Sequence, residues 1–217
     1  MTHPSLSVRG QTAPASPIRR LHPYAVAARK RGLHVYQLNI GQPDLATSST
    51  MLAAYRSFNE TVVAYSPSQG TEALRSGWAA YYNNLVVPAE LPPIGADEVL
   101  ITVGGSEALL FLISAICDPG DAIVVAEPFY TNYRGFAHML GVEVVPVATF
   151  ASEGFAISPE RVAAALTPRC RALIVPTPGN PTGVVLSAGD LVALAEVCAQ
   201  HDMFLICTGT FATAVVV

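Results

Sequence analysis

Three short polar motifs in this chain each follow a predicted buried strand. Gly104-Gly105-Ser106-Glu107 precedes a helical stretch, and the first N–H groups of a helix, together with its dipole, can hold a phosphate. Tyr130 follows the next strand, where an aromatic ring can stack on a planar heterocycle. Asn180, which opens Asn180-Pro181-Thr182-Gly183, offers an amide that can donate to a phenolic or carbonyl oxygen. A phosphorylated planar ring requires this set of contacts.

Each motif also has a purely structural explanation. Gly104-Gly105-Ser106 could be a tight turn with a serine cap, Tyr130 could pack in the core, and Asn180 could form an Asx-type turn. Their joint occurrence at three strand ends favours binding, because ligands of open α/β sheets bind at the carboxyl ends of the strands. We therefore predict one ligand site at this edge of the sheet.

The elements that must position these motifs alternate between strand and helix from about Val99 onward. Strands are predicted at 99–103, 122–126, 142–147, 172–175 and 203–206. Helices are predicted at 106–117, 133–140, 159–166 and 188–200. Continuous apolar strands alternating with helices are typical of a parallel sheet covered on both faces. The sequence thus predicts an α/β protein with three α/β/α layers and a mostly parallel sheet.

The pattern before Val99 is looser. Residues 17–31 have apolar side chains at helical spacing, which predicts an amphipathic helix in an N-terminal arm. No acidic residue precedes Asp44, so a transit peptide is an alternative that we consider less favoured than the arm. A short strand at 38–40, a helix at 71–83 and a proline-rich connector at 86–95 complete the prediction.

Composition excludes several classes of function. Apolar residues make up 51% of the chain and charged residues 13%, with a mean hydropathy of +0.41. The longest relevant apolar run, 108–117, is shorter than the roughly 20 residues that span a bilayer, so no membrane partner is expected. The net charge of -4 gives no basic footprint for nucleic acid. Scattered cysteines and histidines predict no metal site and a reducing, cytoplasmic location.

Five motifs in order give the chain a recognisable pattern. They are Leu38-Asn39-Ile40-Gly41-Gln42-Pro43, the Tyr65-to-Arg75 segment with Gly70 and Leu74, Thr102-Val103-Gly104-Gly105-Ser106-Glu107-Ala108, Tyr130 and Asn180. Taken together they resemble the class I/II aminotransferases, which are fold-type I enzymes that use pyridoxal 5′-phosphate (PLP). The resemblance covers about residues 18–206.

The resemblance implies a cofactor site. Gly105, Ser106 and Glu107 match the loop that holds the PLP phosphate. Tyr130 falls at the ring-stacking position, and Asn180 at the position that bonds the phenolic oxygen of the cofactor. No catalytic residue is carried over, because no lysine in the chain matches the one that holds the cofactor.

The resemblance also implies substrates, a partner and a domain division. Gly41 lies in the loop where the family brings backbone close to the substrate carboxylate, and Tyr65 is expected to reach the cofactor phosphate of the neighbouring subunit of a homodimer. The substrates would be an amino acid and a 2-oxo acid, in amino acid metabolism. Residues 1–60 would form the N-terminal arm and part of the small domain, and 61–217 part of the PLP-binding large domain.

The chain departs from the family near its end. Thr208 stands where the family has an acid that pairs with the pyridine nitrogen, and no Asp or Glu follows Asp202. The single lysine, Lys30, lies in the arm, and no arginine follows Arg171. A transaminase needs a lysine to hold the cofactor and move a proton. We therefore expect a C-terminally truncated, inactive fragment of an aminotransferase.

Two alternatives come from other classes of protein. One is a non-catalytic domain that binds PLP or a phosphate, or that pairs with another chain. A nucleotide-binding Rossmann domain is weaker, because no Gly-x-Gly-x-x-Gly follows the first strand. The family's turn further predicts a cis peptide bond between Asn180 and Pro181, since X-Pro bonds tolerate cis at a cost of about 0.5–1 kcal/mol.

Overall fold

The computed structural model describes residues 4–39, 41, 43–85, 92–209 and 214–216. The chain divides into two compact units. The first joins residues 1–20 to 103–217 and contains the sheet, and the second comprises 21–102. The division predicted at residues 60 and 61 stays a prediction.

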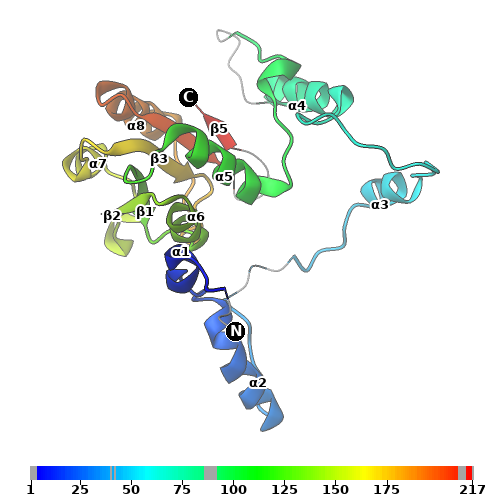
Figure 1. The fold of residues 1–217 in the computed structure, drawn as a ribbon, viewed down its shortest axis with the longest axis horizontal. Coiled ribbons are helices and arrows are strands. Elements are labelled where there is room, and N and C mark those ends of the chain that lie inside the picture. The colour runs from blue at the N-terminus through cyan, green and yellow to red at the C-terminus, as the bar shows by residue number, and fades with distance from the viewer. Residues whose placement is uncertain (1–3, 40, 42, 86–91, 210–213, 217) are drawn as a thin grey trace. The chain divides into compact units, whose positions relative to one another are not determined.

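The first unit is built on a sheet with strand order β2-β1-β3-β4-β5 (Figure 1). Its strands within the described residues are β1 (Ala122–Glu127), β2 (Glu143–Ala148), β3 (Cys170–Pro176), β4 (Phe204–Thr208) and β5 (Ala214–Val216). The pairs β1–β2, β1–β3 and β3–β4 are parallel, and β5 runs antiparallel to β4. The mostly parallel sheet that the alternating pattern predicts is therefore confirmed.

Helices cover both faces of this sheet. They are α5 (Gly104–Ile116), α6 (Asn132–Leu140), α7 (Pro159–Ala165) and α8 (Ala188–Gln200), and a 3-10 turn, η3 (Ala151–Glu153), precedes α7. Alternate residues of β1 face opposite layers: Ile123 and Val125 pack with α5 and α6, whereas Ala122 and Val124 pack with α7 and α8. This period-2 burial on both faces produces the predicted three-layer α/β/α fold.

Local chemistry explains where several of these helices begin and end. Ser158 caps α7 by accepting from the Arg161 N–H, with Pro159 at the first helical position. Ser187 and Asp190 form a capping box at α8. Gly141 ends α6 at φ +74°, a left-handed conformation that glycine adopts without strain.

The N-terminal arm contributes a short helix to the first unit. α1 (Val8–Thr12) is capped by Ser7 and lies against the end of α6, where Arg9 donates to the Met139 carbonyl at 2.8 Å and His138 contacts the Arg9 carbonyl at 2.9 Å. A 3-10 turn, η1 (Arg19–Leu21), follows at the junction of the two units.

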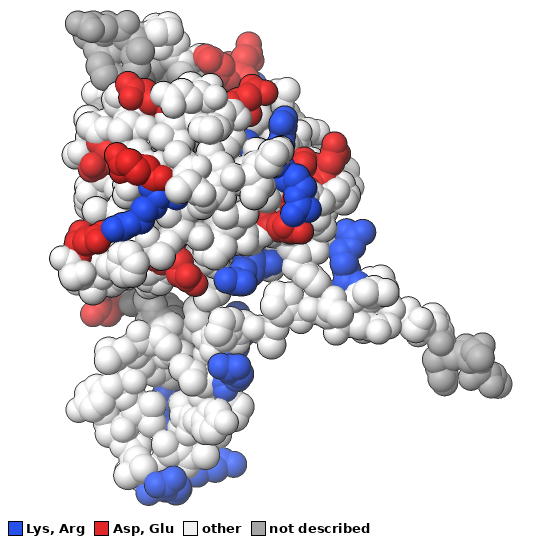
Figure 2. Space-filling model, turned by 90° about the vertical axis from the view of Figure 1, so that its left-hand side faces the viewer, with Lys and Arg blue, Asp and Glu red and all other residues white. Residues whose placement is uncertain are grey.

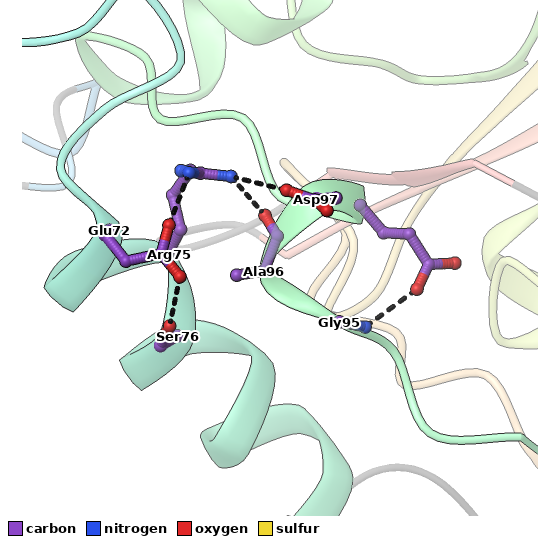
Figure 3. Close-up of polar contacts among 7 residues, drawn as sticks. Glu72, Arg75, Ser76, Gly95, Ala96 and Asp97 are labelled. Atoms are coloured by element: carbon purple, nitrogen blue, oxygen red, sulfur yellow. Dashed lines mark hydrogen bonds and ion pairs between the residues drawn. The ribbon is translucent and has the colours of Figure 1, made fainter.

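The second unit contains α2 (His22–Lys30), α3 (Ser49–Arg56), α4 (Glu72–Leu85) and the 3-10 turn η2 (Ala96–Glu98). The segment 94–101 returns along α4 and is bonded to it through its backbone. Asn83 pairs with both the N–H and the carbonyl of Ile94, at 3.0 and 2.9 Å. Arg75, which is buried, donates to the Ala96 carbonyl at 2.7 Å and to Glu72 at 2.7 Å (Figure 3). The Ile101 N–H donates to the Gln69 carbonyl at 2.9 Å.

Two predicted strands were wrong. Residues 99–103 form no strand, because the Ile101 N–H bonds the loop carbonyl of Gln69 and no ladder partner lies beside this run in the described chain. Residues 38–39 are also not a strand, and Ile40 lies outside the described residues. The predicted cis bond between Asn180 and Pro181 is confirmed.

The sparse charge of the sequence is visible at the surface. Figure 2 shows acidic and basic side chains interspersed, with large uncharged areas between them. Within the described residues, no helix is both long and apolar enough to cross a membrane, and no group of His, Cys, Asp or Glu has the arrangement of a metal site.

Candidate cofactor site

The carboxyl ends of β1, β3 and β4 meet at one edge of the sheet. Pro176 at the end of β3 lies opposite Thr208 at the end of β4, and the Thr177 N–H donates to the Thr208 carbonyl at 2.9 Å. β1 lies on the other side of β3 and runs in the same direction. The loops that carry Tyr130 and Asn180 therefore leave the sheet at the same edge, as the sequence predicts.

The N-terminus of α5 lies at this edge as well. The helix has 13 residues and leads into β1 through the turn 117–121, so its first turn is at the carboxyl end of the strands. Gly104 begins it at φ +78°, and the N-cap residue Val103 makes no side-chain cap hydrogen bond. Gly105 and Ser106 are exposed, with open space beside Gly105, and the Ser106 hydroxyl has no hydrogen bond within the described chain. Uncapped amides at a helix start are suited to an anion.

The Glu107 side chain is engaged at the start of α5. Its carboxylate accepts a hydrogen bond from the N–H of Val103, the N-cap residue of α5, at 2.6 Å. The helix dipole stabilises a negative charge at this position. The same charge repels a phosphate bound at the neighbouring N–H groups, so the carboxylate opposes the binding that the backbone favours.

Tyr130 is held in a defined orientation. It is half-buried against the core beneath α5 and α6, and its phenolic oxygen accepts from the Asn132 amide at 2.7 Å. Its ring meets the Tyr133 ring edge to face, with centroids 5.8 Å apart. An aromatic ring fixed in this way can present a face to a planar ligand without losing further freedom.

Asn180 lies in a tight loop after β3. The Gly179 N–H donates to the Val184 carbonyl at 2.7 Å, and the Gly183 N–H to the Gly179 carbonyl at 2.8 Å. A Cβ at Gly179 would lie 2.6 Å from the Thr182 hydroxyl, so alanine there would force the Thr182 side chain to move. The Asn180 amide is half-buried and makes no hydrogen bond within the described residues. It borders a hollow that Pro128, Thr149 and Thr182 also line and that Tyr130 and Ser106 do not.

Sequence reasoning did not single out Tyr133, which packs beside Tyr130. It is 2% exposed and stacks with Phe129 at 6.3 Å between ring centroids. Burial raises the pKa of its phenol, and a hydrogen bond with Thr208, itself 8% exposed, acts in the opposite direction. Tyr130 precedes α6 and Tyr133 lies in its first turn, so the two rings are neighbours in the chain, whereas Thr208 is far from both in the sequence.

Tyr65 and Gly41 belong to the other unit, so their predicted roles stay predictions. Tyr65 is fully exposed, and its phenol makes no hydrogen bond in the described part of the chain. Gly41 has open space around it.

The groups at the sheet edge fit a phosphorylated planar ring but not a covalent anchor. Uncapped amides of α5 fit the phosphate, Tyr130 fits the ring and the unpaired Asn180 amide fits an oxygen on the ring. Lys30, the single lysine, lies in α2 of the other unit. The three-layer fold and this set of groups are compatible with a phosphorylated ring at the sheet edge.

The chain belongs to a known enzyme family. The sequence profile of the family "Aminotransferase class I and II" matches residues 34–216. The members of this family use PLP. A curated relative, the aspartate/prephenate aminotransferase of Thermus thermophilus, is 37% identical over 205 residues, which are 93% of this chain and 51% of the relative. The arginine–pyruvate transaminase of Pseudomonas aeruginosa is 33% identical over 187 residues, 86% of this chain and 47% of that protein.

Solved structures agree with this assignment. A mutant of the Thermus thermophilus aspartate aminotransferase superposes with a TM-score of 0.85 at 35% identity and covers 95% of this chain and 53% of that one. The alanine aminotransferase from Pyrococcus furiosus gives a TM-score of 0.85 at 27% identity, over 94% of this chain and 51% of the other. The chain thus spans about half the length of the relatives that it matches.

Proposed function

We propose that this chain provides the cofactor-binding half of an aminotransferase that moves an amino group between an amino acid and a 2-oxo acid with PLP. The proposal depends on one observation: the N-terminus of α5, the ring of Tyr130 and the amide of Asn180 all lie at the same edge of the sheet. Relatives named for aspartate, prephenate, arginine and pyruvate support substrates of this general class.

Each residue of the site has a binding or orienting role. The N–H groups of Gly105, Ser106 and Glu107 hold the phosphate, with the Ser106 hydroxyl as a further donor. Tyr130 stacks on the ring, and the Asn180 amide donates to the phenolic oxygen. PLP, when bound, supplies an electron-withdrawing ring that stabilises negative charge at the α-carbon of the substrate. Tyr65, contributed by a second copy, and Gly41, near the substrate carboxylate, complete the proposed site in a homodimer.

The chain by itself is expected to bind the cofactor weakly and to lack transaminase activity. A transaminase requires an amine that moves a proton at the substrate α-carbon, and the chain has no lysine beyond Lys30. Lys30 lies exposed at the end of α2. Thr208, a neutral group, stands at the end of β4 where a carboxylate would favour a protonated ring.

Equilibrium dialysis of the full chain with PLP tests the binding. Ser106→Ala should weaken binding about 2- to 10-fold, since a net hydrogen bond contributes about 0.5–1.5 kcal/mol. Ser114→Ala is the matched control, because Ser114 lies on the same helix and bonds only the Phe111 carbonyl. Equal affinities of the two variants would place the phosphate elsewhere.

A transaminase assay tests the predicted lack of activity. The chain with saturating PLP, offered amino acids and 2-oxoglutarate, should show no turnover above that of free PLP. Turnover that the Lys30→Ala variant loses would contradict this part of the proposal.

A further inference from the structure

Asn132, the first residue of α6, bonds a neighbouring side chain rather than the helix backbone. Its amide donates to the phenolic oxygen of Tyr130 at 2.7 Å, and both residues are half-buried. Within the described residues this is the one hydrogen bond that the Asn132 side chain makes. Asparagine at the start of a helix often caps the backbone through its side-chain oxygen. Asn132 makes no such cap, so the needs of the helix do not explain its contact with the phenol.

The other contacts of Tyr130 leave its phenolic end unrestrained. The Tyr133 N–H donates to the Tyr130 carbonyl at 3.1 Å, which holds the backbone. The two rings meet edge to face, with centroids 5.8 Å apart and planes at 89°, which limits the Tyr130 ring on one side. In the described part of the chain, the phenol itself is bonded to Asn132 alone. Asn132 therefore supplies the second point that fixes the plane of the ring.

A ring that is fixed before a ligand arrives binds that ligand more tightly, because less side-chain freedom is lost on binding. The loss for one side chain corresponds to about 2- to 10-fold in affinity. This gain applies to a ligand whose own ring stacks on Tyr130. A phosphate without a ring gains nothing from it, because its contacts are with the N-terminus of α5.

We propose, building on the proposed function, that Asn132 is a positioning residue of the cofactor site, which holds the phenol of Tyr130 and thereby sets the plane on which a phosphorylated heterocycle stacks. In this role Asn132 touches no ligand atom and acts through Tyr130. Its effect is confined to ligands that carry an aromatic ring, and the phosphate seat at α5 is independent of it.

Phosphorus NMR titration of the full chain with two probes tests this role. Pyridoxine 5′-phosphate carries the ring and forms no imine with Lys30, because it has no aldehyde, whereas ethyl phosphate carries no ring. The ratio of their dissociation constants measures the contribution of the ring, and the wild-type chain should prefer the ring compound. Asn132→Leu, of similar size, should reduce this preference about 2- to 10-fold and leave the dissociation constant of ethyl phosphate unchanged.

Asn132→Asp is the matched control. A carboxylate at this position accepts the phenolic proton, so the bond to Tyr130 is kept with the opposite polarity. The added negative charge weakens the binding of both phosphates, so their ratio should stay within about twofold of the wild-type value. General damage to the fold would instead weaken both probes in the Asn132→Leu variant.

Tyr130→Phe removes the other half of the bond and keeps the ring. It should lower the preference for the ring compound as much as Asn132→Leu does. The double variant should lose no more than either single variant, because both changes remove the same bond. A larger loss in Tyr130→Phe than in Asn132→Leu would mean that the phenol acts on the ligand directly, which contradicts the positioning role.

Other results would also overturn the inference. An unchanged ratio in Asn132→Leu, or losses that add in the double variant, would refute the positioning role and leave the proposed cofactor site in place. If Asn132→Leu does not fold, an unchanged ratio in Tyr130→Phe gives the same refutation. Equal binding of both probes by the wild-type chain would refute the positioning role together with the ring-binding part of the proposed function.

Discussion

Replacement of Gly70 by alanine should destabilise the second unit strongly. Gly70 has φ +96°, and a Cβ built there lies 2.5 Å from Cγ1 and 2.6 Å from Cβ of Ile101. The left-handed backbone costs a residue with a Cβ about 1–2 kcal/mol. Overpacking adds about 1–3 kcal/mol, because Ile101 is branched at Cβ and is tied to Gln69 by its N–H. We expect a loss of about 2–5 kcal/mol in the free energy of unfolding.

Gly77→Ala is the matched control. Gly77 lies inside α4 with nothing within 4 Å of a built Cβ, so alanine there should stabilise the helix by about 0.5–1 kcal/mol. Urea unfolding followed by the fluorescence of Trp78 measures both variants, since this single tryptophan lies in α4 against Tyr81 and Tyr82. An unchanged midpoint for Gly70→Ala would show that Gly70 and Ile101 are not in contact, which would refute the reasoning.

Three further outcomes are expected. Glu107→Gln should tighten binding of pyridoxine 5′-phosphate about fivefold in equilibrium dialysis, because two like charges about 4 Å apart repel by about 1 kcal/mol in water. Ser187→Ala should lower the free energy of unfolding by about 1 kcal/mol through loss of the α8 cap. Separately from the cap, hydrogen bonds from the Ser187 hydroxyl and N–H hold the pKa of Asp190 below its usual range, so the stabilisation from the Asp190 carboxylate is present at neutral pH and is lost as the pH falls through the lowered pKa. An unfolding series in acid should show a flatter dependence for Ser187→Ala than for the wild-type chain. Burial raises the pKa of Cys117 and of Cys198 to about 11, so iodoacetamide at pH 8 should modify both more slowly than free cysteine.

Local sequence patterns predict most elements of the first unit, which contains the sheet. The helix predicted at 188–200 is observed with the same bounds, because apolar periodicity and the Ser187 cap coincide there. The strands predicted at 122–126 and 172–175 are each observed one to three residues longer. Both strands are buried on both faces of the sheet, so a continuous apolar run in the sequence marks their position.

Prediction fails where partners that are distant in the chain decide the structure. The composition of the run 99–103 predicts a strand. In the structure the Ile101 N–H donates to the Gln69 carbonyl, and no strand lies beside this run in the described residues. α1 and α3 were missed; they are short helices of 5 and 8 residues, and neither buries a residue. Motifs suggest Gly105, Ser106, Tyr130 and Asn180 as site residues, and that assignment stays a prediction. The packing of Tyr133 between Phe129 and Tyr130 is not visible in a motif, because it depends on how α6 lies against the sheet.

The way segment 94–101 is bonded to α4 and to the turn before it determines which changes it can tolerate. Asn83, Arg75 and Gln69 all reach backbone atoms of this segment, at Ile94, Ala96 and Ile101. Backbone groups are the same for every residue except proline, so most exchanges of side chain between these points preserve the bonds. A single inserted or deleted residue between Ala96 and Ile101 would move one attachment away from its partner. Natural variation in this segment should therefore alter residue types while conserving the number of residues between the attachments.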